Sequence, residues 1–165
     1  MRKGLFFIIG GLLMLTSCVS KSGIRHLAEE NLRESVYYPK QLKILAVSEP
    51  DSAYGVNYFN PKEVQGMLRI MKVVTDSIMK RTNGMTEFNP DDYYVISLAD
   101  RQMRATNEIR EMVFRQQRKG EWTGWKVKID YEAIDHSGCK YRSERWFFTD
   151  KKGHHIIRTF DIPLP

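Results

Sequence analysis

Two residues in the C-terminal part of the chain could form a nucleophilic pair. His136 and Cys139 flank an expected turn, and a thiol beside an imidazole is the arrangement that cysteine-based catalysis uses. The sequence offers no third group and no oxyanion donor beside them. An enzyme that uses His136, Cys139 or His155 is therefore the weaker hypothesis, and the alternative is a loop histidine with a half-buried thiol.

Metal binding is the second chemistry that the residue types suggest. His154 and His155 are adjacent, and adjacent strand residues point to opposite faces, so they cannot share one ion without a bulge. Asp91, Asp92 and Asp100 could form an acid pair or a calcium site, but the first two occupy an expected helix start, where capping explains them. The sequence also lacks GxSxG, CxxC, HExxH and a phosphate-binding glycine loop. We expect no catalytic residues, no metal and no cofactor.

Aromatic and cationic residues are concentrated in the last third of the chain. An aromatic sheet face can line a pocket for a hydrophobic ligand or peptide, and arginines beside it can bind anions or aromatic rings. The residues that we expect on such a surface are Trp125, Tyr131, Trp146, Arg142, Arg145 and Arg158. The alternative is a filled core, and the face that each arginine occupies depends on a strand register that the sequence leaves open.

The start of the chain has the pattern of an export signal. Two cations, Arg2 and Lys3, precede an apolar run from Gly4 to Leu15 that is too short to span a bilayer. The run ends in Leu15-Thr16-Ser17-Cys18, which resembles the lipobox that lipoprotein signal peptidase recognises. This resemblance implies acyl chains on Cys18, and several acyl chains hold a protein on a membrane almost irreversibly.

These features divide the chain into a signal peptide over 1–17, a lipidated tether over 18–22 and one domain over 23–165. Val19-Ser20-Lys21-Ser22-Gly23 lacks the aspartate that retains many lipoproteins in the inner membrane. It also has no acidic pair after the lysine, and such a pair would resemble the surface-export signal of Bacteroidetes lipoproteins. We therefore expect an outer-membrane protein whose domain faces the periplasm, with surface exposure as the alternative.

The charge balance is mildly basic. Lys and Arg number 26 and Asp and Glu number 20, so removal of Arg2 and Lys3 leaves 24 against 20. Residues 101–165 contain 14 basic and 9 acidic residues, which suggests an anionic lipid, an acidic glycan or a cell-envelope protein as partner and not nucleic acid. An ordinary solvated surface is the alternative. Cys139 has no cysteine partner besides Cys18, so no intramolecular disulfide is expected.

Apolar spacing predicts three helices separated by turns and a short strand region. The first runs from about Ser22 and ends before Pro39, because residues before proline avoid the helical region. The second begins at Asn60-Pro61-Lys62-Glu63 and ends at Asn83-Gly84, and the third begins at Asn89-Pro90-Asp91-Asp92 and ends at Lys119-Gly120. A strand is expected over Leu42–Val47, and a strand or a loop over Ser52–Tyr58.

From Glu121 the apolar period changes to two, which predicts strands with one packed and one wet face. The packed residues are Trp125, Val127, Ile129, Tyr131 and Ala133, and the wet ones are Lys126, Lys128, Asp130 and Glu132. Turns at Asp135–Gly138 and Asp150–Gly153 delimit two more strands, near Cys139–Thr149 and His154–Ile162. The prediction is an α+β domain in which amphipathic helices pack on one face of an antiparallel sheet that ends in a three-stranded meander.

Two segments carry a family resemblance. Leu32–Ile44, LRESVYYPKQLKI, is similar to a helix-proline-strand junction, and Tyr141–His154, YRSERWFFTDKKGH, is similar to a penultimate strand and turn. Both resemble uncharacterised members of the cystatin-like and NTF2-like group of α+β folds, many of them small exported Bacteroidetes lipoproteins. The resemblance implies a concave sheet that forms a pocket. It includes no catalytic signature.

Three functions are consistent with these observations. The first is a non-catalytic, membrane-anchored binding or scaffold domain that meets its partner through the sheet. The second is a carrier of a small hydrophobic ligand, which requires an open pocket between sheet and helices of roughly 300 Å³ or more. The third is the envelope enzyme.

Overall fold

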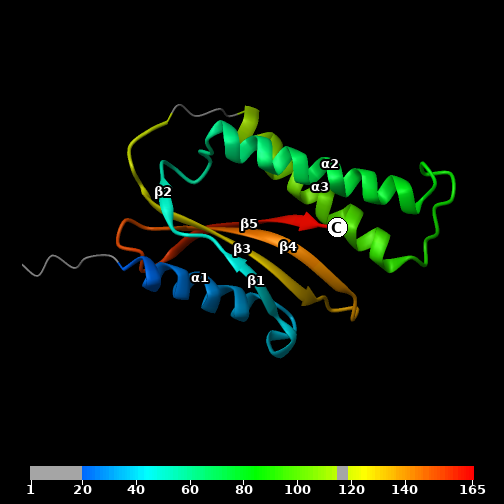
Figure 1. Cartoon of the computed structure of the whole chain (residues 1–165), viewed down its shortest axis with the longest axis horizontal. Helices are drawn as coiled ribbons and strands as arrows, with labels where there is room; N and C mark the ends of the chain where they lie inside the picture. The colour runs from blue at the N-terminus through cyan, green and yellow to red at the C-terminus, as the bar shows by residue number, and fades with distance from the viewer. Residues whose placement is uncertain (1–19, 115–118) are drawn as a thin grey trace, which may run out of the picture.

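The structure is a computed structural model, and it describes residues 20–114 and 119–165. The expected signal peptide and Cys18 lie outside the described residues, as do positions 115–118, which precede the expected helix end at Lys119-Gly120. The elements are α1 (Lys21–Ser35), the 3₁₀ helix η1 (Pro39–Gln41), β1 (Lys43–Val47), β2 (Asp51–Ala53), α2 (Pro61–Arg81), α3 (Tyr93–Phe114), β3 (Gly124–Ile134), β4 (Lys140–Thr149) and β5 (Ile156–Leu164) (Figure 1).

The five strands form one antiparallel sheet in the order β1-β3-β4-β5, with β2 also paired to β3. In the β3–β4 ladder Trp125 is opposite Thr149 and Ile134 is opposite Lys140, and in the β4–β5 ladder Arg145 is opposite Asp161. The α+β class and the terminal meander are thus confirmed. The short β2 shows that most of Ser52–Tyr58 is a loop.

The helices divide between the two faces of the sheet, whereas the sequence led us to expect them on one. Ile24, Ala28 and Leu32 of α1 pack on one face, and α2 and α3 cover the other (Figure 1). The reason is visible in β4, where three consecutive residues, Trp146, Phe147 and Phe148, are all buried. Consecutive strand residues point to opposite faces, so both faces need a cover.

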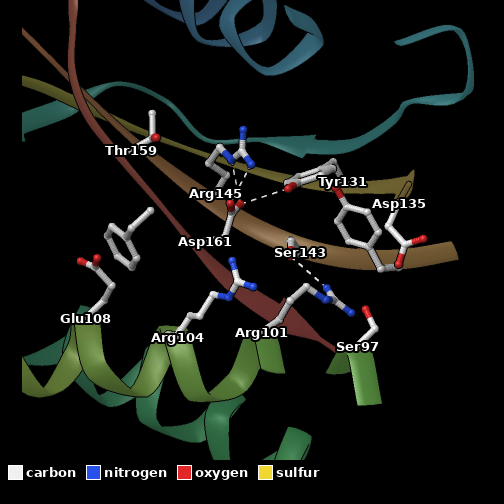
Figure 2. Close-up of a pocket in the computed structure, with 13 residues that line it drawn as sticks. Ser97, Arg101, Arg104, Glu108, Tyr131, Asp135, Ser143, Arg145, Thr159 and Asp161 are labelled. Atoms are coloured by element: carbon white, nitrogen blue, oxygen red, sulfur yellow. Dashed lines mark hydrogen bonds and ion pairs between the residues drawn. The ribbon is translucent and has the colours of Figure 1, made fainter. Parts of the chain in front are cut away.

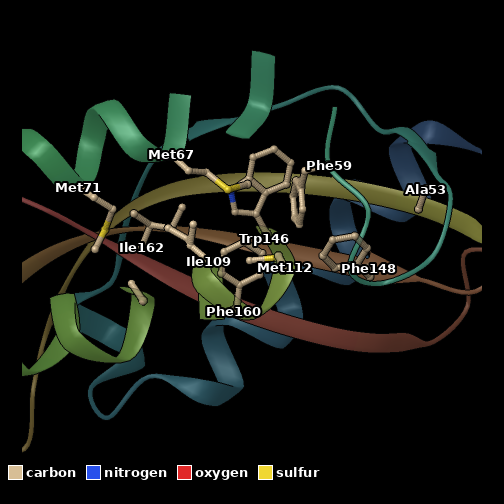
Figure 3. Close-up of a cluster of buried hydrophobic side chains, with 11 residues drawn as sticks. Ala53, Phe59, Met67, Met71, Ile109, Met112, Trp146, Phe148, Phe160 and Ile162 are labelled. Carbon is tan, nitrogen blue, oxygen red and sulfur yellow. The ribbon is translucent and has the colours of Figure 1, made fainter. Parts of the chain in front are cut away.

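The face under α2 and α3 is an aromatic core. Trp146 stacks on Phe160 with ring centroids 6.4 Å apart, and Phe59 meets Trp146, Phe148 and Phe160 edge-on (Figure 3). Met67, Met71, Ile109 and Met112 fill the space between these rings and the helices. Edge-on and offset ring pairs are the arrangements that aromatic quadrupoles favour.

Lys126 corrects the expectation of a wet face on β3. Its side chain is only 3% exposed, because its Nζ lies 2.7 Å from the Glu63 carboxylate at the start of α2. Glu63 also accepts a hydrogen bond from the Asn60 backbone N–H at 2.8 Å, which completes the expected capping box. The ion pair therefore fixes the start of α2 over the middle of the sheet.

The helix ends follow the expected signals with small shifts. Asn83 and Gly84 adopt positive φ angles of 45° and 67°, and the Gly84 N–H donates to the Met79 carbonyl at 2.8 Å, which ends α2. Leu68 of α2 is apolar but about half exposed. Helix α3 begins at Tyr93, later than expected, because Asp92 is the residue whose side chain accepts the Val95 N–H at 3.2 Å.

The first helix and the last strand also differ from expectation at their ends. Helix α1 begins at Lys21 and ends at Ser35, ahead of the η1 turn that starts at Pro39. Strand β5 begins at Ile156, so His154 and His155 belong to the preceding turn, where both backbone N–H groups donate to Asp150. Both expected hairpin turns are confirmed.

Gly66 provides a test of the helix α2 packing. It is exposed within α2, and an added Cβ would meet nothing within 4 Å. Gly66→Ala should raise the free energy of unfolding by about 0.5–1 kcal/mol, because glycine loses more backbone entropy than alanine in a helix. Gly124→Ala is the opposite control, since its Cβ would lie 2.0 Å from the Thr149 carbonyl oxygen. Urea denaturation measures both, and an unchanged or lowered midpoint for Gly66→Ala would contradict the packing.

Candidate functional site

The structure does not bring the three expected aromatic lining residues together. Trp125 and Tyr131 have odd positions on β3 and face α1, whereas Trp146 faces α2 and α3 inside the core. The Trp125 indole packs edge-on against Trp122 and donates to the Lys151 carbonyl at 3.3 Å. Tyr131 borders a cavity beside α3, and Trp146 borders a different one.

The three expected arginines also separate. Arg142 is exposed and lies 3.4 Å from Glu132, and Arg145 faces the α1 side, where it binds Asp161. Arg158 is on the α2 and α3 side, where it donates to the Val56 carbonyl at 3.1 Å and contacts Asn57 and Glu108. Arg145 alone joins Tyr131 at the cavity.

This cavity, which we call the α3 pocket, lies at the β5 edge of the sheet, where α3 meets side chains that strands β3 to β5 present mostly on the α1 side. It has a volume of about 350 Å³ (Figure 2). One wall is a single face of α3, and the other comes from the sheet and the β3–β4 turn. The residues around it are Ser97, Arg101, Arg104, Ala105, Glu108, Tyr131, Asp135, Tyr141, Ser143, Arg145, Thr159, Phe160 and Asp161.

A hydrogen-bonded ion pair forms the sheet wall of the α3 pocket. Arg145 donates to Asp161 through Nε and Nη2, each at 2.7 Å, and the Tyr131 hydroxyl donates to the same carboxylate at 3.0 Å. Ser35 of α1 contacts the Arg145 guanidinium from behind. Burial by itself would lower the pKa of Arg145, but the hydrogen bonds and charge of Asp161 raise it above its ordinary value. Arg145 is therefore a fixed cation whose charge is already neutralised.

Tyr131 is the neutral member of this network. Burial raises the pKa of its hydroxyl far above the ordinary value, and the neighbouring Asp161 charge adds to the effect. The hydroxyl thus remains a proton donor at every physiological pH. It donates to Oδ1 of Asp161, the oxygen that also accepts from Arg145 Nε.

Arg101 is held in position differently, by neutral groups. Its Nη1 donates to the Arg142 carbonyl at 2.9 Å and to the Ser143 hydroxyl at 3.3 Å, and its guanidinium lies 4.6 Å from the centre of the Tyr141 ring. Its Nε is buried without an acceptor among the described residues. Burial lowers the pKa of Arg101, and the tyrosines around it, together with the more distant Asp161 charge, offset this only in part. Arg101 is the pocket cation without a carboxylate partner in the described chain.

The sequence did not single out Arg101. Its helical neighbours Asp100, Arg104 and Glu108 have the mixed charges that are typical of a solvated helix face. The structure turns part of that face toward the sheet, and Ser97, Arg101, Arg104, Ala105 and Glu108 recur at helical spacing along the pocket. This helical spacing was the available signal in the sequence, but it does not show which surface of the protein that face of α3 packs against.

The residues of the expected thiol, imidazole and acid sites make local contacts of other kinds. The His136 ring lies 6.1 Å from the Tyr37 ring, and Cys139 is a half-buried free thiol. Asp92 caps α3, and Asp100 pairs with Arg104 at 2.7 Å. Within the described ranges, no three His, Cys, Asp or Glu side chains come together in a way that could hold a metal ion.

A second cavity of about 340 Å³ lies beside the start of α2. Its polar wall is formed by Glu144, which accepts from Lys128 at 2.8 Å and from the Trp146 indole at 2.7 Å. Lys128 also lies 3.7 Å from Asp130, and these charges raise its pKa although burial opposes them. The buried and half-buried charges at this cavity, Glu63, Lys128 and Glu144, are paired, and Lys62 at its border is exposed to solvent.

The Asp161 network allows a direct test. Asp161→Asn should lower the free energy of unfolding by about 1–3 kcal/mol, because it leaves the Arg145 guanidinium, whose side chain is 14% exposed, without a counter-ion. Tyr131→Phe should have the smaller effect, about 1 kcal/mol. Arg145→Met combined with Asp161→Asn should recover part of the loss, as a double-mutant cycle would measure. Equal stability of Asp161→Asn and wild type at pH 7 would show that the pair contributes nothing.

Comparisons with protein-family models, curated protein sequences and solved structures give no match. The chemistry of the α3 pocket must therefore be inferred from the residues that line it. Their arrangement is a small open cavity with one wall fixed by an ion pair and one cation that has no carboxylate beside it.

Proposed function

We propose that this chain is a membrane-anchored, non-catalytic binding domain that takes a small ligand into the α3 pocket. The observation that carries the proposal is the open cavity itself, whose volume of about 350 Å³ falls within the range of roughly 300–1,000 Å³ typical of small-ligand sites. Polar side chains line it and are held in place by hydrogen bonds that do not depend on a ligand.

The α3 pocket supports a ligand carrier better than a scaffold that binds through an open sheet. Helices pack on both faces of the sheet, and the aromatic residues of β4 are used as core. Of the pocket walls, Tyr131, Tyr141, Phe160 and Ala105 offer apolar surface, while Ser97 and Ser143 offer hydroxyl groups. A ligand with both an apolar and a polar part fits this lining better than a purely hydrophobic one.

The proposed lipid on Cys18 would place the domain close to a bilayer. Helix α1 begins at Lys21, three residues after Cys18, so the acyl chains would hold the N-terminal end of α1 near the lipid. The β3–β4 turn, which brings Asp135 to the α3 pocket, lies toward the opposite end of the molecule (Figure 1). In the described part of the chain, no helix is both long and apolar enough to cross a bilayer.

Two parts of this proposal rest on sequence resemblance. One is an outer-membrane location facing the periplasm, and the other is membership of the small Bacteroidetes lipoproteins with cystatin-like or NTF2-like domains. Partners among anionic lipids, acidic glycans and envelope proteins rest on charge alone. An enzyme that uses His136, Cys139 or His155 stays the weaker alternative, because none of these three residues borders the α3 pocket.

Lipid anchoring is tested by Cys18→Ser. The variant should move from the membrane pellet to the soluble fraction, because it lacks the sulfur that would carry the acyl chains. Radiolabelled palmitate should be incorporated by the wild type and not by the variant. Sedimentation of Cys18→Ser with the outer membrane would show that lipid is not the principal anchor.

Ligand binding in the α3 pocket is tested by filling it. Thr159 is exposed on β5 and borders the pocket, so Thr159→Trp should block it and weaken binding at least about tenfold without disturbing the core. Ile157→Trp is the matched control, since Ile157 lies two residues away on the same strand, is 54% exposed and does not border the pocket. Ligand-observed NMR with a library of small carboxylates, phosphates and neutral aromatics measures binding. Hits that bind equally to both variants would exclude the α3 pocket as the site.

A further inference from the structure

We infer that the ligand of the α3 pocket carries an acidic oxygen group, a carboxylate or a phosphoryl group, and that Arg101 is its counter-ion. This inference rests on the proposed function and adds the chemical class of the ligand. It follows from which charges around the pocket are paired, from the orientation of Arg101 and from the other donors beside it.

The charges that border the α3 pocket are three arginines and three carboxylates. The ion pairs that they form decide which charge has no partner. Arg145 is neutralised by Asp161, and Arg104 pairs with Asp100 at 2.7 Å. Glu108 pairs with Arg158. Arg101 is the remaining cation, and in the part of the chain that the structure describes no carboxylate lies within ion-pairing distance of it.

Asp135 is the remaining carboxylate, and it is committed to its own turn. Its Oδ1 accepts the Ser137 N–H at 2.9 Å, the Ser137 hydroxyl at 2.6 Å and the Cys139 N–H at 3.0 Å. Burial would raise the pKa of Asp135, but these hydrogen bonds outweigh burial and lower it. Asp135 therefore stabilises the β3–β4 turn and leaves the charge of Arg101 unbalanced.

The position of Arg101 is set before any ligand arrives. Its Nη1 donates to the Arg142 carbonyl and to the Ser143 hydroxyl (Figure 2). Its guanidinium also lies over the ring of Tyr141. Nη2 makes no hydrogen bond to any described residue. A guanidinium that is already ordered loses little side-chain entropy on binding, and its planar donors match the oxygens of a carboxylate or phosphate.

Burial makes the absence of a counter-ion at Arg101 energetically important. The Nε of Arg101 is enclosed without an acceptor, and burial lowers its pKa, which means that the surroundings disfavour the charged form. An anion at the open side of the guanidinium would offset that effect more strongly than it would in water, since the local dielectric is lower. A neutral ligand of the same shape would not.

Further donors lie where such an anion would sit. Arg104 is next along the same face of α3 and extends toward the sheet beside Arg101 (Figure 2). The Ser97 hydroxyl borders the same space, and the half-buried Tyr141 offers ring surface for the rest of the ligand, with the buried Phe160 behind it. A small aromatic or acyclic acid satisfies both the charge and the apolar wall.

The test compares three probes of one shape: phenylacetate, phenyl phosphate and the neutral phenylacetamide. Calorimetry or NMR titration of the wild type should show that at least one anion binds about tenfold or more tightly than the amide, the effect of one charged hydrogen-bonded pair. Arg101→Gln should reduce that preference to about twofold or less, and Arg101→Lys should retain part of it. The control Arg69→Gln removes the same charge from the exposed side of α2 and should leave the preference unchanged.

The outcomes separate the inference from the proposed function. Equal binding of anion and amide to the wild type, or an undiminished preference in Arg101→Gln, would overturn the role of Arg101 while the pocket remains a binding site. An equal loss in Arg69→Gln would show that general charge attraction, and not Arg101, selects the anion, and would also overturn it. Binding that Thr159→Trp does not weaken would overturn the proposed function. The carboxylate and phosphate arms show which acid the pocket prefers, and circular dichroism confirms that Arg101→Gln is folded.

Discussion

The ion pair between Arg145 and Asp161 is the contact on which both the domain and its pocket depend. It links β4 to β5, receives the Tyr131 hydroxyl from β3 and contacts Ser35 of α1, so four elements meet at one carboxylate and one guanidinium. A largely buried arginine is tolerated because its partner is fixed, and removing either partner leaves a charge that the interior cannot solvate. The pair also commits Asp161, the carboxylate whose charge acts on Arg101 from beyond ion-pairing distance. The unbalanced charge of Arg101 is thus a consequence of the contact that holds the sheet wall together.

Local sequence signals predicted the elements well because the physics behind them is local. The capping box at Asn60 and Glu63, the stop at Gly84 and the turns at Asp135 and Asp150 depend on residues a few positions apart. The division of the helices between two faces was not predicted, because the alternation in β3 suggested that Lys126 was solvated. The consecutive apolar residues Trp146, Phe147 and Phe148 were the contrary evidence, since such a run needs cover on both sides. Lys126 could be buried only because Glu63 comes from a helix 63 residues earlier in the chain, a pairing that no local pattern contains.

The sequence predicted only the residues of the candidate site that lie on the strands. Tyr131 and Arg145 were both named from the sequence and do meet at the α3 pocket, but Trp125 and Trp146 were grouped with them although they occupy opposite faces. Whether two residues on paired strands share a face depends on the register, and a shift of one residue across the Asp135–Gly138 turn reverses the answer. Arg101 was missed for a different reason. Its partners are a backbone carbonyl, a hydroxyl and a ring from β4, and a pairing of this kind leaves no complementary charge pattern in the sequence.

Arg101 also links stability to binding. A domain of this size has a net stability of only about 5–15 kcal/mol, so a partly buried cation without a counter-ion is a notable burden for a chain whose other buried charges, such as Lys126 and Arg145, are paired. An anion that binds the folded state and not the unfolded chain would relieve that burden, and the gain would grow with the logarithm of its concentration above Kd. Replacing Arg101 with a neutral residue would relieve it permanently. Replacement of Arg101 should therefore remove the preference for an acid and leave the ligand-free domain at least as stable as the wild type. This relation between stability and binding is expected where a charged residue serves ligand binding and not the fold.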